Sequence, residues 1–454
     1  MVFSNPIVPF VIGVAAVVLL LVWLKLPAFL GLVIASMAIG IFTDQIPIGD
    51  VPSEIAGSFG DVMVAIGIPI LMAAIIGKTL MDSGAAERIV RAFLSITGEK
   101  NSEFALLGSS YLLSIPVFFD NVFYLLAPLG RSMKARTGVK LSLYISVLAA
   151  GALSTHMLVP PTPGPLAMAD ELGVDLGIAI LVGATLALPS SLLAGIVYGR
   201  FLHSREDFPL REAMGATADS LRDKAEADLS ELPGLVESLL PILLPVVLIA
   251  SSTIAGTLYE GGSIVTATTF LGDPNFALTA AALVSAYTFY RFEMDGDVDL
   301  FNSELTEAIK SGGNIIAITA AGGTFGAMLA TAGVGEYIAG GLEEIGLGLL
   351  FTGWLIAAII RVAQGSGTVA ILTGASIMAP LAGGLSVNPV YLMMAVGFGG
   401  MIAPWFNDSG FWIIKETAGI NTMETFKSYG AVATIMSISG LAMVFIMSTV
   451  LPLA

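Results

Sequence analysis

The sequence predicts an all-α, polytopic membrane protein built from two inverted repeats. Each repeat is expected to hold about five transmembrane helices, a re-entrant hairpin and a broken helix. Three observations predict this class: an apolar composition, apolar runs that recur along the whole chain, and polar interruptions at matching places in the two halves. Of the 454 residues, 56% are hydrophobic and only 12% are charged. Runs near 20 residues are long enough to cross about 30 Å of hydrocarbon.

The composition also excludes several classes of protein. The chain has no cysteine and only two histidines, His156 and His203, so neither a disulfide framework nor a metal cluster is expected. A net charge of −16 argues against nucleic acid as a partner. The sequence shows no nucleophile–base pair and no phosphate-binding loop. We therefore expect no enzyme, no primary pump, no metal and no cofactor.

Ordinary spans account for most of the two halves. The first half, 1–201, is expected to cross the membrane near 7–25, 27–43, 61–81, 139–164 and 177–201. The second half, 236–454, is expected to cross near 236–259, 274–292, 311–333, 389–414 and 428–453. The first run carries no basic segment and no cleavage site, so it is interpreted as a mature span. Residues 202–235 are polar and form a linker.

Two apolar segments, 104–130 and 347–381, are expected to enter the membrane and return on the same side. The loop 131–140 is strongly basic, whereas 44–61 and 260–273 carry only acidic charges. Basic loops face the cytoplasm. They can all share that side only if both segments are hairpins. The linker 202–235 is then cytoplasmic, and both chain termini are outside.

Five crossings per half is an odd number, so the second half is inverted relative to the first. The polar interruptions have similar spacing in the two halves: Asp120 and Pro160 are 40 residues apart, and Gln364 and Asp408 are 44 apart. Inverted repeats with paired interruptions indicate the binding site of a secondary transporter. We therefore expect the four interruptions to meet at one site.

The first interruption lies in SIPVFFDN, 114–121. Pro116 stops a helix, and Asp120 and Asn121 follow near the start of the next half-helix. The free N–H groups of a helix N-terminus favour a carboxylate there, while burial favours the protonated acid. Asp120 and Asn121 are predicted to bind substrate, and Asp120 to carry a coupling proton. A plain helix cap without a transport role is the alternative.

The second interruption is LVPPTPGPLA, 158–167, where the prolines prevent a continuous helix. A loop at membrane depth lines a site or a pathway. Pro161, Thr162 and Gly164 are therefore predicted to contact substrate. His156 precedes the loop and is a candidate proton carrier. A neutral histidine bonded to the interior is the equal alternative.

The third interruption, RVAQGSGTVAILTGAS, covers 361–376. Gln364, Gly365, Ser366 and Thr368 are predicted to contact substrate, since hydroxyls and free N–H groups suit a carboxylate or a polyol. Arg361, at the root of this hairpin, can pair with an acid or meet substrate.

The fourth interruption, APWFNDSGFW, covers 403–412. It places Asn407, Asp408 and Ser409 together at membrane depth, and all three are predicted to contact substrate. Asp408 is the second candidate for the coupling proton. A tight Asn-Asp-Ser-Gly turn is the local alternative.

The motifs SIPVFFDNVFYLLAPL, LVPPTPGPLA, RVAQGSGTVAILT and NDSGFWIIKE together resemble the gluconate permease family. The resemblance implies a proton-coupled symporter in a prokaryotic cell membrane, importing gluconate or a related small sugar acid or hydroxy acid. It also implies an elevator-like movement. Family members are expected to carry histidines where Thr162 and the APWF segment stand, so coupling to Na⁺, or cation/H⁺ antiport, is the alternative. A homodimer is expected, because a scaffold must hold still while another part moves.

Overall fold

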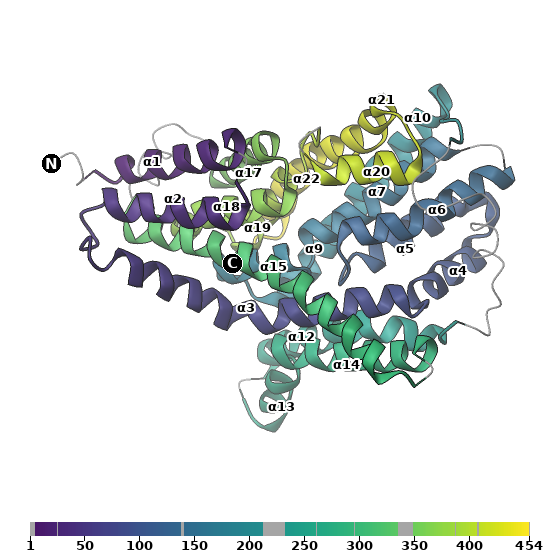
Figure 1. Cartoon of the computed structure of the whole chain (residues 1–454), viewed down its shortest axis with the longest axis horizontal. Helices are drawn as coiled ribbons and strands as arrows, with labels where there is room; N and C mark the ends of the chain where they lie inside the picture. The colour runs from purple at the N-terminus through teal and green to yellow at the C-terminus, as the bar shows by residue number, and fades with distance from the viewer. Residues whose placement is uncertain are drawn as a thin grey trace.

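The computed structural model describes residues 5–24, 26–137, 140–211, 232–259, 261–294, 296–334, 348–385, 387–405 and 408–453. Within these ranges the regular structure is entirely helical. Seven helices are long and apolar enough to cross a membrane, and several shorter apolar helices accompany them. The helices run roughly along the longest axis of the molecule (Figure 1). The predicted all-α membrane class is confirmed.

Two very long helices pack along each other: α3 (Val51–Asp82) and α15 (Val298–Thr331). Each extends well beyond the apolar run that predicted it, 61–81 and 311–333. The side chain of Asp297 caps α15 by accepting the N–H of Leu300 at 2.9 Å, so this helix starts in polar sequence. Two helix pairs flank them: α1 (Ile7–Val17) with α2 (Ala28–Phe42), and α12 (Leu235–Leu258) with α14 (Pro274–Glu293).

The two segments predicted as hairpins are each divided into two helices that pack together. The first holds α5 (Ser102–Leu113) and α6 (Phe119–Thr137), and the second holds α17 (Leu349–Gln364) and α18 (Gly367–Met378). In Figure 1, α5 and α6 extend toward the end of the molecule where α10 (Gly199–Arg205) lies, and α17 lies in the other half, near the inner end of α1. The turns at 114–118 and at Gly365–Ser366 fall where proline and glycine predicted them.

The proline-rich interruption separates α7 (Leu141–Leu158) from α8 (Pro163–Glu171). Pro160 and Pro163 lack the N–H groups that would bond to the carbonyls of His156 and Val159. The hydroxyl of Thr162 takes their place and lies 3.2 Å and 2.7 Å from these two carbonyl oxygens. Thr162 is therefore fully buried as part of the break.

The fourth interruption separates α19 (Val390–Gly399) from α20 (Ser409–Ala418). Two further membrane-length segments complete the bundle. One joins α9 (Leu176–Ser191) to α10 through a π-helical turn, and the other joins α21 (Thr422–Thr425) to α22 (Ala431–Val450) in the same way. Two short helices absent from the sequence prediction are α4 (Ala85–Thr97) and α13 (Ser263–Leu271).

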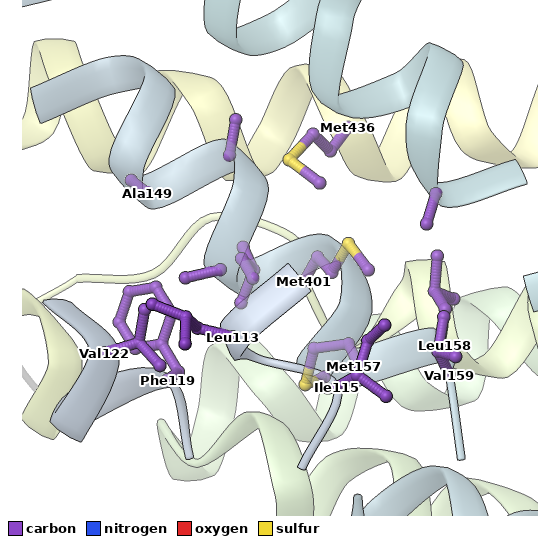
Figure 2. Packing of buried hydrophobic residues seen from close by; sticks show 14 of the residues in the cluster. Leu113, Ile115, Phe119, Val122, Ala149, Met157, Leu158, Val159, Met401 and Met436 are labelled. Carbon is purple, nitrogen blue, oxygen red and sulfur yellow. The ribbon is translucent and has the colours of Figure 1, made fainter. Parts of the chain in front are cut away.

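The main apolar core lies where the interrupted helices meet. Figure 2 shows Ile115 of the first hairpin turn close to Met157 beside the second break; Leu113, Leu158, Val159 and Met401 belong to the same cluster. All six are buried. Burial of a large apolar side chain contributes roughly 1.5–3 kcal/mol. The irregular segments are thus held in place by packing as well as by hydrogen bonds.

Residues 206–211, which follow α10, are held by contacts with α6 and α21. Phe208 is fully buried, and Asp207 forms an ion pair with Lys134 of α6. Arg211 donates to both carboxylate oxygens of Glu424 at 2.5 and 2.9 Å. The start of the segment predicted as a linker is therefore part of the packed structure, while residues 212–231 lie outside the described ranges.

Candidate functional site

A cavity of about 450 Å³ lies where the four interruptions converge. Four helices begin at its wall. The lining residues from their first turns are Phe119, Asp120 and Asn121 of α6, Pro163 and Gly164 of α8, Gly367, Thr368 and Val369 of α18, and Ser409 and Gly410 of α20. Helix N-termini present unpaired N–H groups and the positive end of the helix dipole. Their convergence creates a cavity suited to an anion.

Local sequence explains how two of these helices begin. Asp408 precedes α20, and its Oδ1 accepts the N–H of Gly410 at 3.0 Å. Ser366 precedes α18, and its Oγ accepts the N–H of Val369 at 3.3 Å. Such caps leave the remaining first-turn N–H groups available. Gly164 allows α8 to approach α18, because a Cβ at this position would lie 2.7 Å from Cδ1 of Ile371.

A buried ion pair forms one side of the cavity. Nη2 of Arg361, from α17, lies 2.7 Å from Oδ2 of Asp408, and the two side chains are only 3% and 7% exposed. Tyr429 donates its hydroxyl to the same Oδ2 at 2.8 Å and lies 3.3 Å from Nη2. Nη1 of Arg361 donates to the carbonyl of Gly365 at the hairpin turn. Arg361 is the one Lys or Arg among the described residues that line the cavity.

Asp120 and His156 face the same cavity from the other half of the chain. Asp120 lies in the first turn of α6. The ring of His156 meets the ring of Phe118 edge-on at 6.1 Å, and its Nδ1 has no hydrogen-bond partner in the described part of the chain. The cavity thus contains one guanidinium, two carboxyls and one imidazole, a set that can bind an anion and hold protons.

Most residues predicted for the site line this cavity. They are Asp120, Asn121, His156, Gly164, Ser366, Thr368, Asp408 and Ser409. Pro161, Thr162 and Gly365 are not among the lining residues. Thr162 turns toward backbone carbonyls, and Gly365 contributes its own carbonyl to Arg361. Asn407 and the side chain of Gln364 lie outside the described residues.

Four polar residues that line the cavity were not predicted from the sequence. Ser311, Asn314 and Thr319 of α15 form a polar stripe on the cavity wall. Their spacing places them on one face of a helix, and this was an available signal in an otherwise apolar run. Tyr429 lies at the start of the last span and is 2% exposed. A lone tyrosine in that position carries no signal in the sequence.

Comparisons with known proteins show which sequences and structures the chain is similar to. The sequence pattern described as GntP family permease matches residues 5–450. The high-affinity gluconate transporter of Escherichia coli K12 is 34% identical, over 96% of this chain and 98% of its own. The Gnt-II system L-idonate transporter of the same organism is 29% identical, over 98% of this chain and all of its own. The crystal structure of the YdaH transporter of Alcanivorax borkumensis superposes with a TM-score of 0.67 at 12% identity, over 97% and 100% of the two chains.

Proposed function

The chain belongs to the GntP permease family, a family of membrane transporters and not of enzymes, and we propose that it imports gluconate or a related small sugar acid together with protons. The observation that carries this proposal is the cavity that is lined by four helix N-termini and by the buried guanidinium of Arg361. Both features favour a carboxylate. The relatives named as gluconate and L-idonate transporters indicate the substrate class.

The polar wall is suited to the hydroxyl groups of a sugar acid. Ser366, Thr368 and Ser409 supply hydroxyls, and Asn121 and Asn314 supply amides that both donate and accept hydrogen bonds. A cavity of about 450 Å³ lies within the usual range for small-molecule sites. We also keep as proposed substrate contacts the other residues predicted from the sequence, namely Pro161, Thr162, Gln364, Gly365 and Asn407.

The arrangement of the helices supports two inverted repeats, 1–201 and 236–454, joined through 202–235. The pair α1–α2 corresponds to α12–α14, α3 to α15, the hairpin α5–α6 to α17–α18, the broken helix α7–α8 to α19–α20, and α9 to α22. Neighbours in one repeat are matched in the other, since α5 packs on α7 as α17 packs on α19. We propose that the hairpins and broken helices move as a unit against α3 and α15, as in an elevator.

Proton coupling is proposed to reside in Asp120, Asp408 and His156. Asp408 neutralises Arg361, so a substrate carboxylate that binds Arg361 must share or replace that partner. A proton taken up by Asp408 would free the guanidinium for the substrate. The family position further supports a multi-pass protein of a prokaryotic cell membrane. We propose that both termini lie outside and that the chain forms a homodimer.

Uptake into proteoliposomes tests the function. Labelled gluconate should accumulate above its external concentration when the outside is more acidic than the lumen. Excess L-idonate should compete with it. Accumulation driven by a Na⁺ gradient and indifferent to pH would replace the proton with Na⁺ as the coupling ion. Failure to bind or accumulate any sugar acid under either gradient would refute the proposal.

Two substitutions test the site within that assay. Arg361→Gln should weaken gluconate binding by roughly 10- to 150-fold, because it removes a charge-assisted hydrogen bond of about 1.5–3 kcal/mol. Arg131→Gln is the matched control, since Arg131 is also buried but donates to the carbonyls of Ala418 and Arg211 away from the cavity. Asp120→Asn should exchange gluconate without accumulating it. Accumulation by Asp120→Asn would remove Asp120 from the coupling role.

A further inference from the structure

A third carboxyl group lies outside the cavity, in a trough on α15. Glu171 is the last residue of α8, and its side chain is mostly withdrawn from solvent. A Cβ on Gly326 of α15 would lie 2.6 Å from its Oε1, and a Cβ on Gly323 would lie 3.2 Å from its Oε2. Any larger residue at Gly326 would therefore displace the carboxyl group. The two glycines make room for it.

No Lys or Arg is among the described residues that line the space beside Glu171. A small void of about 10 Å³ adjoins it, lined by α3, α8, α15 and α18. Among the described lining residues, α3, α15 and α18 present only apolar side chains, a glycine and the hydroxyls of Thr319 and Ser376. Asp170, which is exposed, is the only other titratable group there. A carboxylate buried without a cation is strongly disfavoured relative to the neutral acid.

The trough is connected to the substrate cavity through the same elements. Thr319 of α15 lines both spaces. The N-terminal residues of α8 and α18 line the cavity, while Glu171 and Ser376 at their other ends contact α15. A movement of α8 and α18 relative to α15 would therefore withdraw Glu171 from the trough.

We propose that Glu171 is a proton-binding site separate from the substrate cavity, and that its protonation controls whether α8 and α18 pack against α15. The protonated acid fits a trough without cations, whereas the carboxylate is stable only where water or a counter-charge reaches it. By thermodynamic linkage, if protonation of Glu171 favours one position of α8 and α18, then moving these helices must change the proton affinity of Glu171. The effect on transport rests on the proposed function, but proton binding at Glu171 does not.

Infrared difference spectroscopy of the purified protein tests the proton site without any substrate. A pH titration of the wild type should show a carbonyl stretching band of a protonated carboxyl that is absent from Glu171→Gln. Asp170→Asn is the matched control, because it removes an adjacent exposed acid, and it should retain the band. An identical band in Glu171→Gln, or no band in the wild type, would overturn the assignment.

Transport assays test the gating role. In Glu171→Gln, which mimics the protonated acid, gluconate exchange should persist while pH-driven accumulation falls about 5-fold or more. Gly326→Ala is an independent arm, since its methyl group would lie 2.6 Å from Oε1 of Glu171 and 2.5 Å from Cβ of Ser376. It should bind gluconate and fail to transport it. Wild-type accumulation and pH profile in either variant would refute the gating role. A wild type inactive toward sugar acids would instead refute the proposed function and leave the infrared result to decide the proton site.

Discussion

Replacing Asp408 with leucine is expected to destabilise the folded protein by about 3–5 kcal/mol. The carboxylate pairs at 2.7 Å with Arg361, and both side chains are almost completely buried. Without Asp408, the hydrogen-bond partners of the guanidinium among the described residues are the hydroxyl of Tyr429 and the carbonyl of Gly365. An uncompensated charge would then remain on a side chain that is only 3% exposed. The cap on the N–H of Gly410 would also be lost.

The double substitution separates the ion pair from other effects. Arg361→Met combined with Asp408→Leu removes both charges and fills the space with apolar side chains of similar size. Buried ion pairs replaced in this way often cost little. The double variant should therefore be more stable than Asp408→Leu alone, with an interaction energy between the two sites of about 2 kcal/mol or more.

Denaturant titration in mixed micelles, followed by tryptophan fluorescence, measures these free energies of unfolding. Glu416→Leu is the control on the same helix, because Glu416 pairs with Lys415 at 2.6 Å and is itself 49% exposed. It should cost at most about 1 kcal/mol. If Asp408→Leu is as stable as the wild type, or if the double variant is no more stable than Asp408→Leu, the reasoning is wrong.

Two further predictions concern stability away from the cavity. In the same titration, Gly151→Ala should destabilise the protein by at least about 1–3 kcal/mol. The new Cβ would lie 2.6 Å from the carbonyl oxygen of Leu107, and a backbone atom cannot move aside as a side chain can. A neutral effect would contradict this close packing of α7 on α5. Partial burial raises the pKa of the Asp207 carboxyl, but hydrogen bonds from Lys134 and from backbone N–H groups outweigh this and hold the pKa below its ordinary value. Because the folded-state pKa is depressed, Asp207→Asn should lower stability above the unfolded-state pKa of about 4. The difference from wild type should shrink below that value and vanish once the pH has fallen through the lower folded-state pKa. A difference that persists in stronger acid would contradict the electrostatic origin.

The sequence located the helix breaks because they depend on local chemistry. Proline cannot continue a helix, and glycine readily takes the backbone conformation with φ of +97° that Gly365 adopts at the hairpin turn. The same reasoning placed Asp120 near the start of a half-helix. These features require only residues close together in the chain.

Thr162 was predicted to contact substrate but does not line the cavity, because of the prolines beside it. The carbonyls left without donors by Pro160 and Pro163 capture the hydroxyl of Thr162. A polar residue at a break can thus satisfy the break itself. The sequence pattern alone does not distinguish that role from contact with substrate.

The sequence by itself determined the membrane class, the segments that turn back, and the acids near the breaks, because hydropathy and backbone constraints act over short stretches of chain. Only the tertiary structure decided that Asp408 meets Arg361 and Tyr429, that α15 closes the cavity, and that Glu171 enters a trough on α15. Each of these contacts joins residues far apart in the chain. Their partners depend on how whole helices pack, which local patterns do not encode.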